Sequence, residues 1–130
     1  MTRGILISGP TIAFDDELGR ALEESAEIFK NSNNAEIESI IATHKIDLVL
    51  LEISKDRDWE VEIIKRVKKR FPGVLVVLID GDNKRNVIAQ AFESGVKDAF
   101  RKPYKTELVV ERVNVLIKKL NRNFLNQMIL

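Results

Sequence analysis

Residues 46–53 read IDLVLLEI, and this stretch decides the fold. Its nearly unbroken aliphatic run is typical of a central β-strand that is covered on both faces, because a strand with one solvent-exposed face alternates apolar and polar residues. The carboxylate of Glu52 lies next to the last residue of the run. We therefore expect a sheet with helices on both faces and Glu52 at the carboxyl end of a central strand.

Short runs of Ile, Leu and Val alternate with longer amphipathic segments along the rest of the chain. This alternation predicts five strand–helix units around a parallel sheet. The other strands are expected at residues 4–8, 26–30, 74–79 and 97–102. The helices are expected at residues 15–25, 36–44, 59–71 and 87–94 and from 106 onward.

The composition indicates one globular domain without an export signal. A chain of 130 residues with 45% hydrophobic content can bury one good core, and 21 basic against 20 acidic residues create no general attraction to nucleic acid or a membrane. The basic run at residues 65–70 is interpreted as the solvated face of a helix. The absence of cysteine excludes disulfides and thiolate metal sites. We expect a soluble, cytoplasmic protein.

The C-terminal segment carries an apolar stripe at helical spacing, formed by Val109, Val113, Leu116, Leu120 and Phe124. Apolar residues continue to the last residue of the chain. We therefore divide the chain into a domain at residues 1–120 and an apolar helical extension at residues 121–130. The extension predicts a homodimer through a short coil or docking in the groove of a partner protein, and the remaining alternative is the start of an output region.

Two stretches together resemble the receiver domains of response regulators: IDLVLLEI at residues 46–53 and AFESGVKDAFRKPY at residues 91–104. The resemblance covers the chain to about residue 120. It implies a flavodoxin-like, three-layer α/β fold, in which a five-stranded parallel sheet of order 2-1-3-4-5 has helices on both faces. It also implies a site at the carboxyl ends of strands 1, 3, 4 and 5.

The resemblance places Gly9 and Pro10 where receivers carry two acidic ligands for a divalent cation. Neither residue supplies a side-chain oxygen. Glu52 takes the place of the aspartate that accepts the phosphoryl group, and its extra methylene moves the oxygens by roughly an ångström, a displacement that matters for phosphoryl transfer.

Counting back from Lys102, the retained lysine, places Asp80 and Ala99 at the two switch positions of the family. A carboxylate at position 80 would repel a phosphate, and Ala99 has no ring to move. Lys102 is expected to pair with Glu52, Asp80 or both. Glu52 could thereby imitate a phosphorylated state, but an ordinary ion pair is the preferred interpretation.

The same loops allow three other interpretations. Glu52 and Asp80, with Asp56 or Asp82, could form a shifted cation site, although a solvated acidic rim is preferred. The chain could instead be a working phosphoacceptor that uses Glu52 or Asp80 with Mg²⁺ at a non-standard site. Residues 9–11 could also contact an anionic ligand through backbone amides, although they lack the glycine density of a phosphate cradle.

The sequence thus favours an atypical receiver domain, a pseudo-receiver that works in signal transduction through protein contacts. We expect no catalysis, no cofactor and no nucleic-acid or membrane partner. The expected partner surface lies on the fourth helix, the fifth strand and the last helix, and its residues are Phe92, Phe100, Tyr104, Val113 and Phe124.

Overall fold

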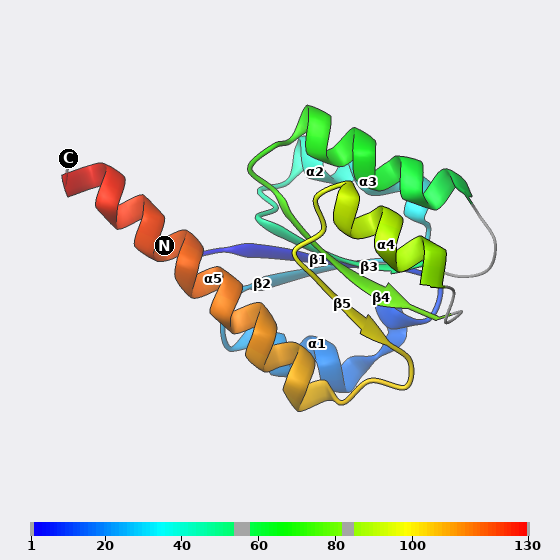
Figure 1. Cartoon of the computed structure of the whole chain (residues 1–130). Helices are drawn as coiled ribbons and strands as arrows, with labels where there is room; N and C mark the ends of the chain where they lie inside the picture. The colour runs from blue at the N-terminus through cyan, green and yellow to red at the C-terminus, as the bar shows by residue number, and fades with distance from the viewer. Residues whose placement is uncertain (1, 54–57, 82–84, 130) are drawn as a thin grey trace.

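A computed structural model describes residues 2–53, 58–81 and 85–129 of the chain (Figure 1). Strands and helices alternate from one end to the other, with two short 3-10 helices in the first half. The strands are β1 (Gly4–Ser8), β2 (Glu27–Asn31), β3 (Leu48–Ile53), β4 (Leu75–Asp80) and β5 (Asp98–Arg101). The helices are η1 (Ile12–Phe14), α1 (Asp16–Glu23), η2 (Asn34–Glu36), α2 (Ile37–Thr43), α3 (Asp58–Arg70), α4 (Arg85–Glu93) and α5 (Thr106–Ile129).

The five strands form one parallel sheet in the order β2-β1-β3-β4-β5, which confirms the expected fold. The central strand β3 is buried at every residue, as its aliphatic run predicted. It begins two residues later than expected, at Leu48. The carboxylate of Asp47 instead accepts a hydrogen bond from the backbone N–H of Gly4 at 2.9 Å, which ties the starts of β1 and β3 together.

The sheet separates two apolar cores. Figure 1 shows α1 and α5 on one face of the sheet and α2, α3 and α4 on the other. Alternate residues of β3 serve the two cores, because successive side chains of a strand point to opposite faces. Val49 and Leu51 pack on the α2–α4 side, whereas Leu48 and Leu50 pack on the α1–α5 side. Burial on both faces explains why this strand shows no polar alternation.

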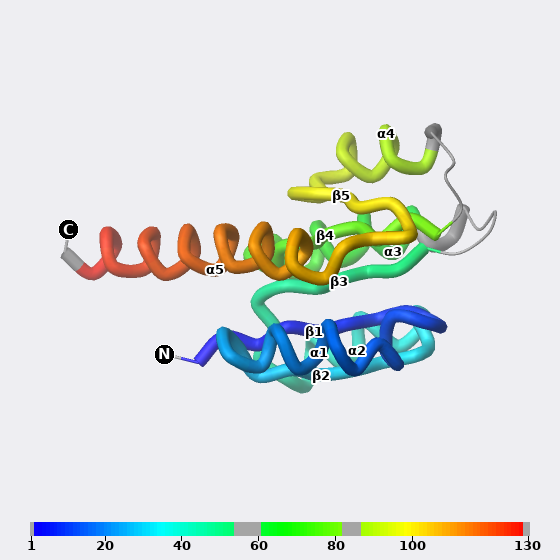
Figure 2. The backbone as a smooth tube through the Cα atoms, turned by 90° about the horizontal axis from the view of Figure 1, so that it is seen from below, coloured from blue at the N-terminus to red at the C-terminus, as the bar shows by residue number. Residues whose placement is uncertain are grey.

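The last helix, α5, is much longer than the sheet needs. Its first part packs over the sheet, and Figures 1 and 2 show its C-terminal part running past the starts of the strands. The side chains of residues 121–128 are all exposed. Among the described residues, no helix is both long enough and apolar enough to cross a membrane.

We predict that two valines of α5 differ sharply in their contribution to stability. Val113 is fully buried, whereas Val115 is 48% exposed. Val113→Ala should lower the free energy of unfolding by about 2 kcal/mol, because it removes two buried methyl groups and leaves a cavity. Val115→Ala should change it by less than about 0.5 kcal/mol. Urea denaturation of both variants checks this, and equal losses would contradict the packing of α5.

Candidate functional site

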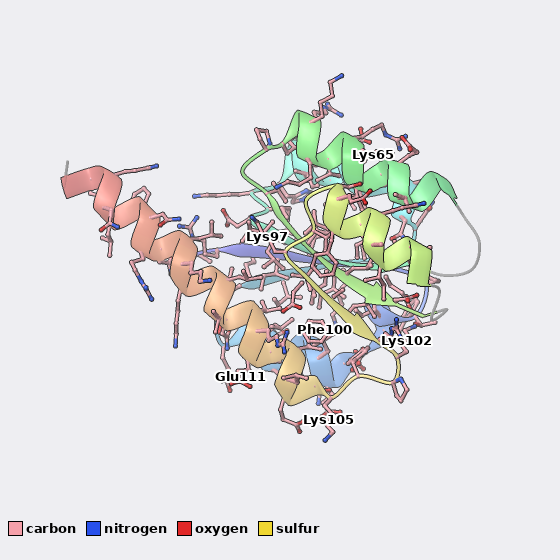
Figure 3. All side chains as sticks on the ribbon, in the orientation of Figure 1. Lys65, Lys97, Phe100, Lys102, Lys105 and Glu111 are labelled. Carbon is pink, nitrogen blue, oxygen red and sulfur yellow. The ribbon has the colours of Figure 1, made fainter. Side chains whose placement is uncertain are left out.

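The carboxyl ends of four strands meet at one edge of the sheet, where open parallel sheets place their sites. In register, Ser8 of β1 lies beside Leu51 of β3, and Asp80 of β4 lies between Ile53 of β3 and Arg101 of β5. Figure 3 shows Lys102 at this edge, with Lys97 at the opposite end of β5. The fold therefore gathers the residues after β1, β3, β4 and β5 that the sequence singled out.

The carboxylate of Glu52 is the centre of this edge, and it is held on both oxygens. The residue is 1% exposed. Its Oε1 accepts hydrogen bonds from the backbone N–H of Thr11 at 2.8 Å and of Ile12 at 3.0 Å. Its Oε2 accepts from the Thr11 hydroxyl and from the Lys102 ammonium. A buried carboxylate must be compensated in this way, because an unpaired buried charge is very costly.

The expected ion pair between Lys102 and Glu52 is present. Its Nζ also donates to the hydroxyl oxygen of Thr11 at 2.6 Å, so that Thr11 bridges the two charged groups. The backbone N–H of Lys102 donates to the carbonyl of Asp80 at 3.0 Å, which fixes the loop after β5 on the end of β4. Partial burial lowers the pKa of Lys102, because desolvation disfavours the charged ammonium.

Gly9 lies so close to Glu52 that there is no room for a side chain at position 9. A Cβ at position 9 would lie 2.3 Å from the Cβ of Glu52 and 2.5 Å from its Oε1. The φ angle of Gly9 is +153°, which side chains of L-residues rarely allow. Only glycine therefore fits beside Glu52 in this conformation. Pro10, the second position of the expected acidic pair, is exposed.

Asp80 and Ala99 lie where the sequence placed them, at and near the ends of the last two strands. Asp80 is 1% exposed at the end of β4. Ala99 lies beside Leu78 in the sheet and packs, partly buried, against the α2–α4 core. The position thus holds a methyl group over this core instead of an aromatic ring.

Three polar residues under the site were missed as site residues. The Ser8 hydroxyl donates to Oδ1 of Asn34 at 2.8 Å and accepts from Nδ2 of Asn31 at 3.0 Å. The amide of Asn34 in turn donates to the backbone carbonyl of Glu52 at 2.8 Å. All three side chains are buried. The available signal was Ser8, a polar residue at the end of an apolar strand, followed later in the sequence by the asparagines at positions 31, 33 and 34.

Thr11 partly matches the interpretation of residues 9–11 as anion contacts. Its backbone N–H does contact an anion, but that anion is the carboxylate of Glu52. The next residue begins η1, so the carboxylate caps this short helix as a side-chain acceptor caps an α-helix. The role of Thr11 as a bridging donor could not be read from the sequence, because it depends on the loop geometry.

Tyr104 connects the loop after β5 to the start of α1. Its hydroxyl donates to Oδ2 of Asp15 at 2.5 Å, and Oδ1 of Asp15 accepts from the backbone N–H of Leu18 at 3.1 Å. Asp15 is thus the N-cap of α1. Burial, followed by the hydrogen bond to Asp15, raises the pKa of Tyr104. The phenol therefore remains a hydrogen-bond donor well above neutral pH.

The expected partner surface is wrong for two of its five residues. Phe100 is 7% exposed and Val113 is fully buried, and both belong to the α1–α5 core. Figure 3 shows Phe100 between β5 and α5. The alternation of strands and helices was predicted correctly, but the side of β5 and of α5 that faces the core was not. Phe92 and Phe124 are exposed, and Tyr104 is half-buried.

Four residues were candidate cation ligands. Asp56 and Asp82 lie outside the described residues, whereas Glu52 and Asp80 lie near the carboxyl ends of β3 and β4. Within the described part of the chain, no three acidic or histidine side chains are grouped closely enough to hold a metal ion. The carboxylate oxygens of Glu52 contact donors of this chain.

Comparison with known proteins identifies the family and supports the fold. Residues 13–114 match the family model of the response regulator receiver domain. The hydrogenase transcriptional regulatory protein HoxA of Bradyrhizobium diazoefficiens is 24% identical over 119 residues, covering 86% of this chain and 24% of that protein. HoxA of Cupriavidus necator is 21% identical over 115 residues, covering 88% and 24%. The chain spans about a quarter of the length of these curated relatives.

Solved structures share the fold at low sequence identity. A CheY-like receiver domain protein from Methanospirillum hungatei has a TM-score of 0.83 at 20% identity, covering 95% of this chain and 99% of that chain. A response regulator from Thermotoga maritima has a TM-score of 0.80 at 21% identity, covering 91% and 99%. At such identities the likeness establishes the fold, and the site must be judged from its own residues.

We predict that Gly9→Ala destabilises the protein by about 2 to 4 kcal/mol, because the new methyl group overlaps Glu52 and the backbone is strained. Gly73→Ala is the matched control, since a Cβ there meets nothing within 4 Å. The control should change the free energy of unfolding by less than about 0.5 kcal/mol. Chemical denaturation measures both variants, and a Gly9→Ala protein as stable as the control would refute the steric fit.

We also predict that Glu52→Gln lowers the free energy of unfolding by about 2 to 4 kcal/mol, because it removes the charge that compensates Lys102 and turns an amide donor toward other donors. Glu62→Gln is the control, since Glu62 forms an exposed pair with Lys65 at 3.1 Å. Exposed pairs contribute about 0 to 1 kcal/mol. Thermal and urea denaturation check the difference. An unaltered melting temperature for Glu52→Gln would show that the buried contacts do not form.

Proposed function

The chain belongs to the response regulator receiver domain family, and from this premise we propose that it is an atypical receiver that is not phosphorylated by the usual route. In this proposal it acts in the cytoplasm as a protein-interaction module of two-component signalling, without catalysis and without a cofactor. The observation that carries the proposal is the Glu52 carboxylate, which is buried and bound on both oxygens by donors of its own chain.

A phosphoacceptor needs a carboxylate oxygen that can approach a phosphorus atom in line. Freeing Oε1 of Glu52 would leave the backbone N–H groups of Thr11 and Ile12 without their acceptor. Freeing Oε2 would separate Glu52 from Lys102, the cation that a phosphoryl group would need. Each lost contact costs on the order of 1 to 3 kcal/mol. These contacts favour a closed, unreactive site.

The surrounding positions support the same proposal. A divalent cation needs several oxygen ligands. Gly9 and Pro10 supply no side-chain oxygen, and an acid at position 9 would collide with Glu52. The buried carboxyl group of Asp80 adds an acid where a phosphoryl group would lie. Electrostatic stabilisation of the transferred group would therefore be poor.

The proposed output is contact with a protein partner through α4, β5 and α5. The exposed residues of the expected surface, Phe92 and Phe124, are 46% and 40% accessible. Phenylalanine is one of the aromatic residues that are enriched at protein interfaces relative to the rest of the surface. The names of the HoxA relatives describe transcriptional regulation, and a regulatory pathway is the corresponding proposal for this chain.

We predict that Mg²⁺ with acetyl phosphate or beryllofluoride leaves the amide chemical shifts of this protein unchanged around Glu52, Asp80 and Lys102. The physical reason is the occupied carboxylate and the missing acidic pair. An active receiver domain titrated in parallel verifies the reagents, and Mg²⁺ alone controls for non-specific binding. Saturable shifts at this edge would instead establish the rival function, a phosphoacceptor that uses Glu52 or Asp80 with a non-standard cation site.

A further inference from the structure

The apolar stripe that fixes α5 to the domain continues beyond the domain. Val109, Val113 and Ile117 are at most 5% exposed and face the core. At the same helical phase follow Phe124 and Met128, which are 40% and 68% exposed. Figures 1 and 2 show this part of the helix beside no other element. The stripe thus keeps its pattern after the sheet has ended.

The helix leaves the body of the domain at a defined point. The side chain of Arg3 donates to Oδ1 of Asn121 at 2.9 Å and to Oδ1 of Asp47 at 3.1 Å. This contact joins α5 to the starts of β1 and β3. From Asn121 to Met128 every described side chain is exposed. Lys118 and Lys119 are also exposed, whereas Leu120 packs against the α1–α5 core. We call the segment from Lys118 to Met128 the α5 extension, and its exposed side chains are available to another molecule.

The charges of this region have one sign. From Arg112 to the end of the chain the sequence contains no aspartate or glutamate. Arg112 pairs with Asp98 at 3.2 Å, so its charge is compensated within the domain. The charged residues of the extension are Lys118, Lys119 and Arg122, and all three are exposed. The extension combines an apolar stripe with a purely basic flank.

An apolar stripe beside basic residues favours one class of binding partner over the others. A second copy would bring its own basic residues against these, in parallel or antiparallel pairing, and like charges oppose association. A membrane would have to accept Gln127, which lies in phase with Phe124, and an amide without partners is costly in hydrocarbon. Nucleic acid would leave the apolar stripe uncovered.

We propose that the α5 extension docks an acidic amphipathic helix of a partner protein. The apolar face of the partner covers Phe124, Leu125 and Met128, and its acidic residues face Lys118 and Arg122, which lie one helical turn apart on the flank beside Leu125. Gln127 can exchange hydrogen bonds with polar side chains of such a helix. This proposal rests on the proposed function, since it names the surface and the partner chemistry of the interaction module.

The size of the surface predicts weak binding. Eleven helical residues span about 16 Å, so the interface falls below the size of stable complexes. A dissociation constant on the order of micromolar is expected, with a strong salt dependence, because the paired charges are exposed.

The test uses the full chain and three labelled synthetic peptides in fluorescence anisotropy titrations. The first peptide is a helix with leucine at spacings of three and four and glutamate between. The second replaces glutamate by lysine, and the third scrambles the first. The acidic amphipathic peptide should bind about tenfold or more tightly than either control. Equal binding of the three peptides, or no binding at low salt, would overturn the proposal.

Two pairs of variants locate the contact. Phe124→Asn should weaken binding of the acidic peptide about tenfold, whereas Leu108→Asn should leave it unchanged. Leu108 is a matched control because it lies on the same helix and is also 40% exposed. Arg122→Gln should weaken binding about threefold and reduce its salt dependence. Arg20→Gln, which removes an exposed charge of α1, should do neither. The same affinity for Phe124→Asn and the unaltered chain would overturn the proposal.

Experiments with the same variants also test the three other binding partners: a second copy of the chain, a membrane and nucleic acid. Sedimentation showing a dimer that Phe124→Asn dissolves would assign the extension to a second copy. Stronger co-sedimentation with phosphatidylglycerol vesicles than with phosphatidylcholine vesicles, again lost in Phe124→Asn, would assign it to a membrane. Binding of a DNA duplex lost in Arg122→Gln would assign it to nucleic acid. Any of these results overturns the acidic partner, and none changes the beryllofluoride result on which the proposed function depends.

Discussion

The carboxylate of Glu52 is the constraint from which the carboxyl edge of this sheet takes its form. It belongs to the central strand, and its donors come from two loops that are far apart in the sequence. Thr11 and Ile12 fix the start of η1, and Lys102 fixes the loop after β5. A single buried charge thereby determines how two loops close over the sheet, since the hydrogen bonds from both loops together compensate the desolvation of the Glu52 carboxylate.

The asparagine network beneath the site extends this constraint into the second strand. Asn34 donates to the backbone carbonyl of Glu52, Ser8 donates to Asn34, and Asn31 donates to Ser8. Buried networks of this kind are stable only when their groups are paired, and they specify one arrangement of the loops. On the opposite side, Tyr104 and Asp15 tie α1 to the loop after β5. Paired polar groups thus tie the loops of this edge together on both sides of Glu52.

Much of the fold could be predicted from the sequence because its signals are local. The aliphatic run at residues 46–53 predicted a doubly covered strand, and β3 is buried throughout. The pairing of Lys102 with Glu52 followed from their expected places at the carboxyl ends of the third and fifth strands, which meet at one edge of the sheet. The roles of Thr11 and Asn34 could not be predicted, since they depend on loop directions that no periodicity encodes. Phe100 and Val113 were misplaced because an apolar residue on an edge element can face a core or solvent.

The close fit between Gly9 and Glu52 couples the sequence at these two positions. A Cβ at position 9 would lie 2.3 Å from the Cβ of Glu52, an atom that every residue except glycine carries. Shortening the acid at position 52 to aspartate would therefore leave this overlap in place. A side chain at position 9 requires the backbone of the loop after β1 to move away from β3, so the path of that loop and the residue at position 9 must change together.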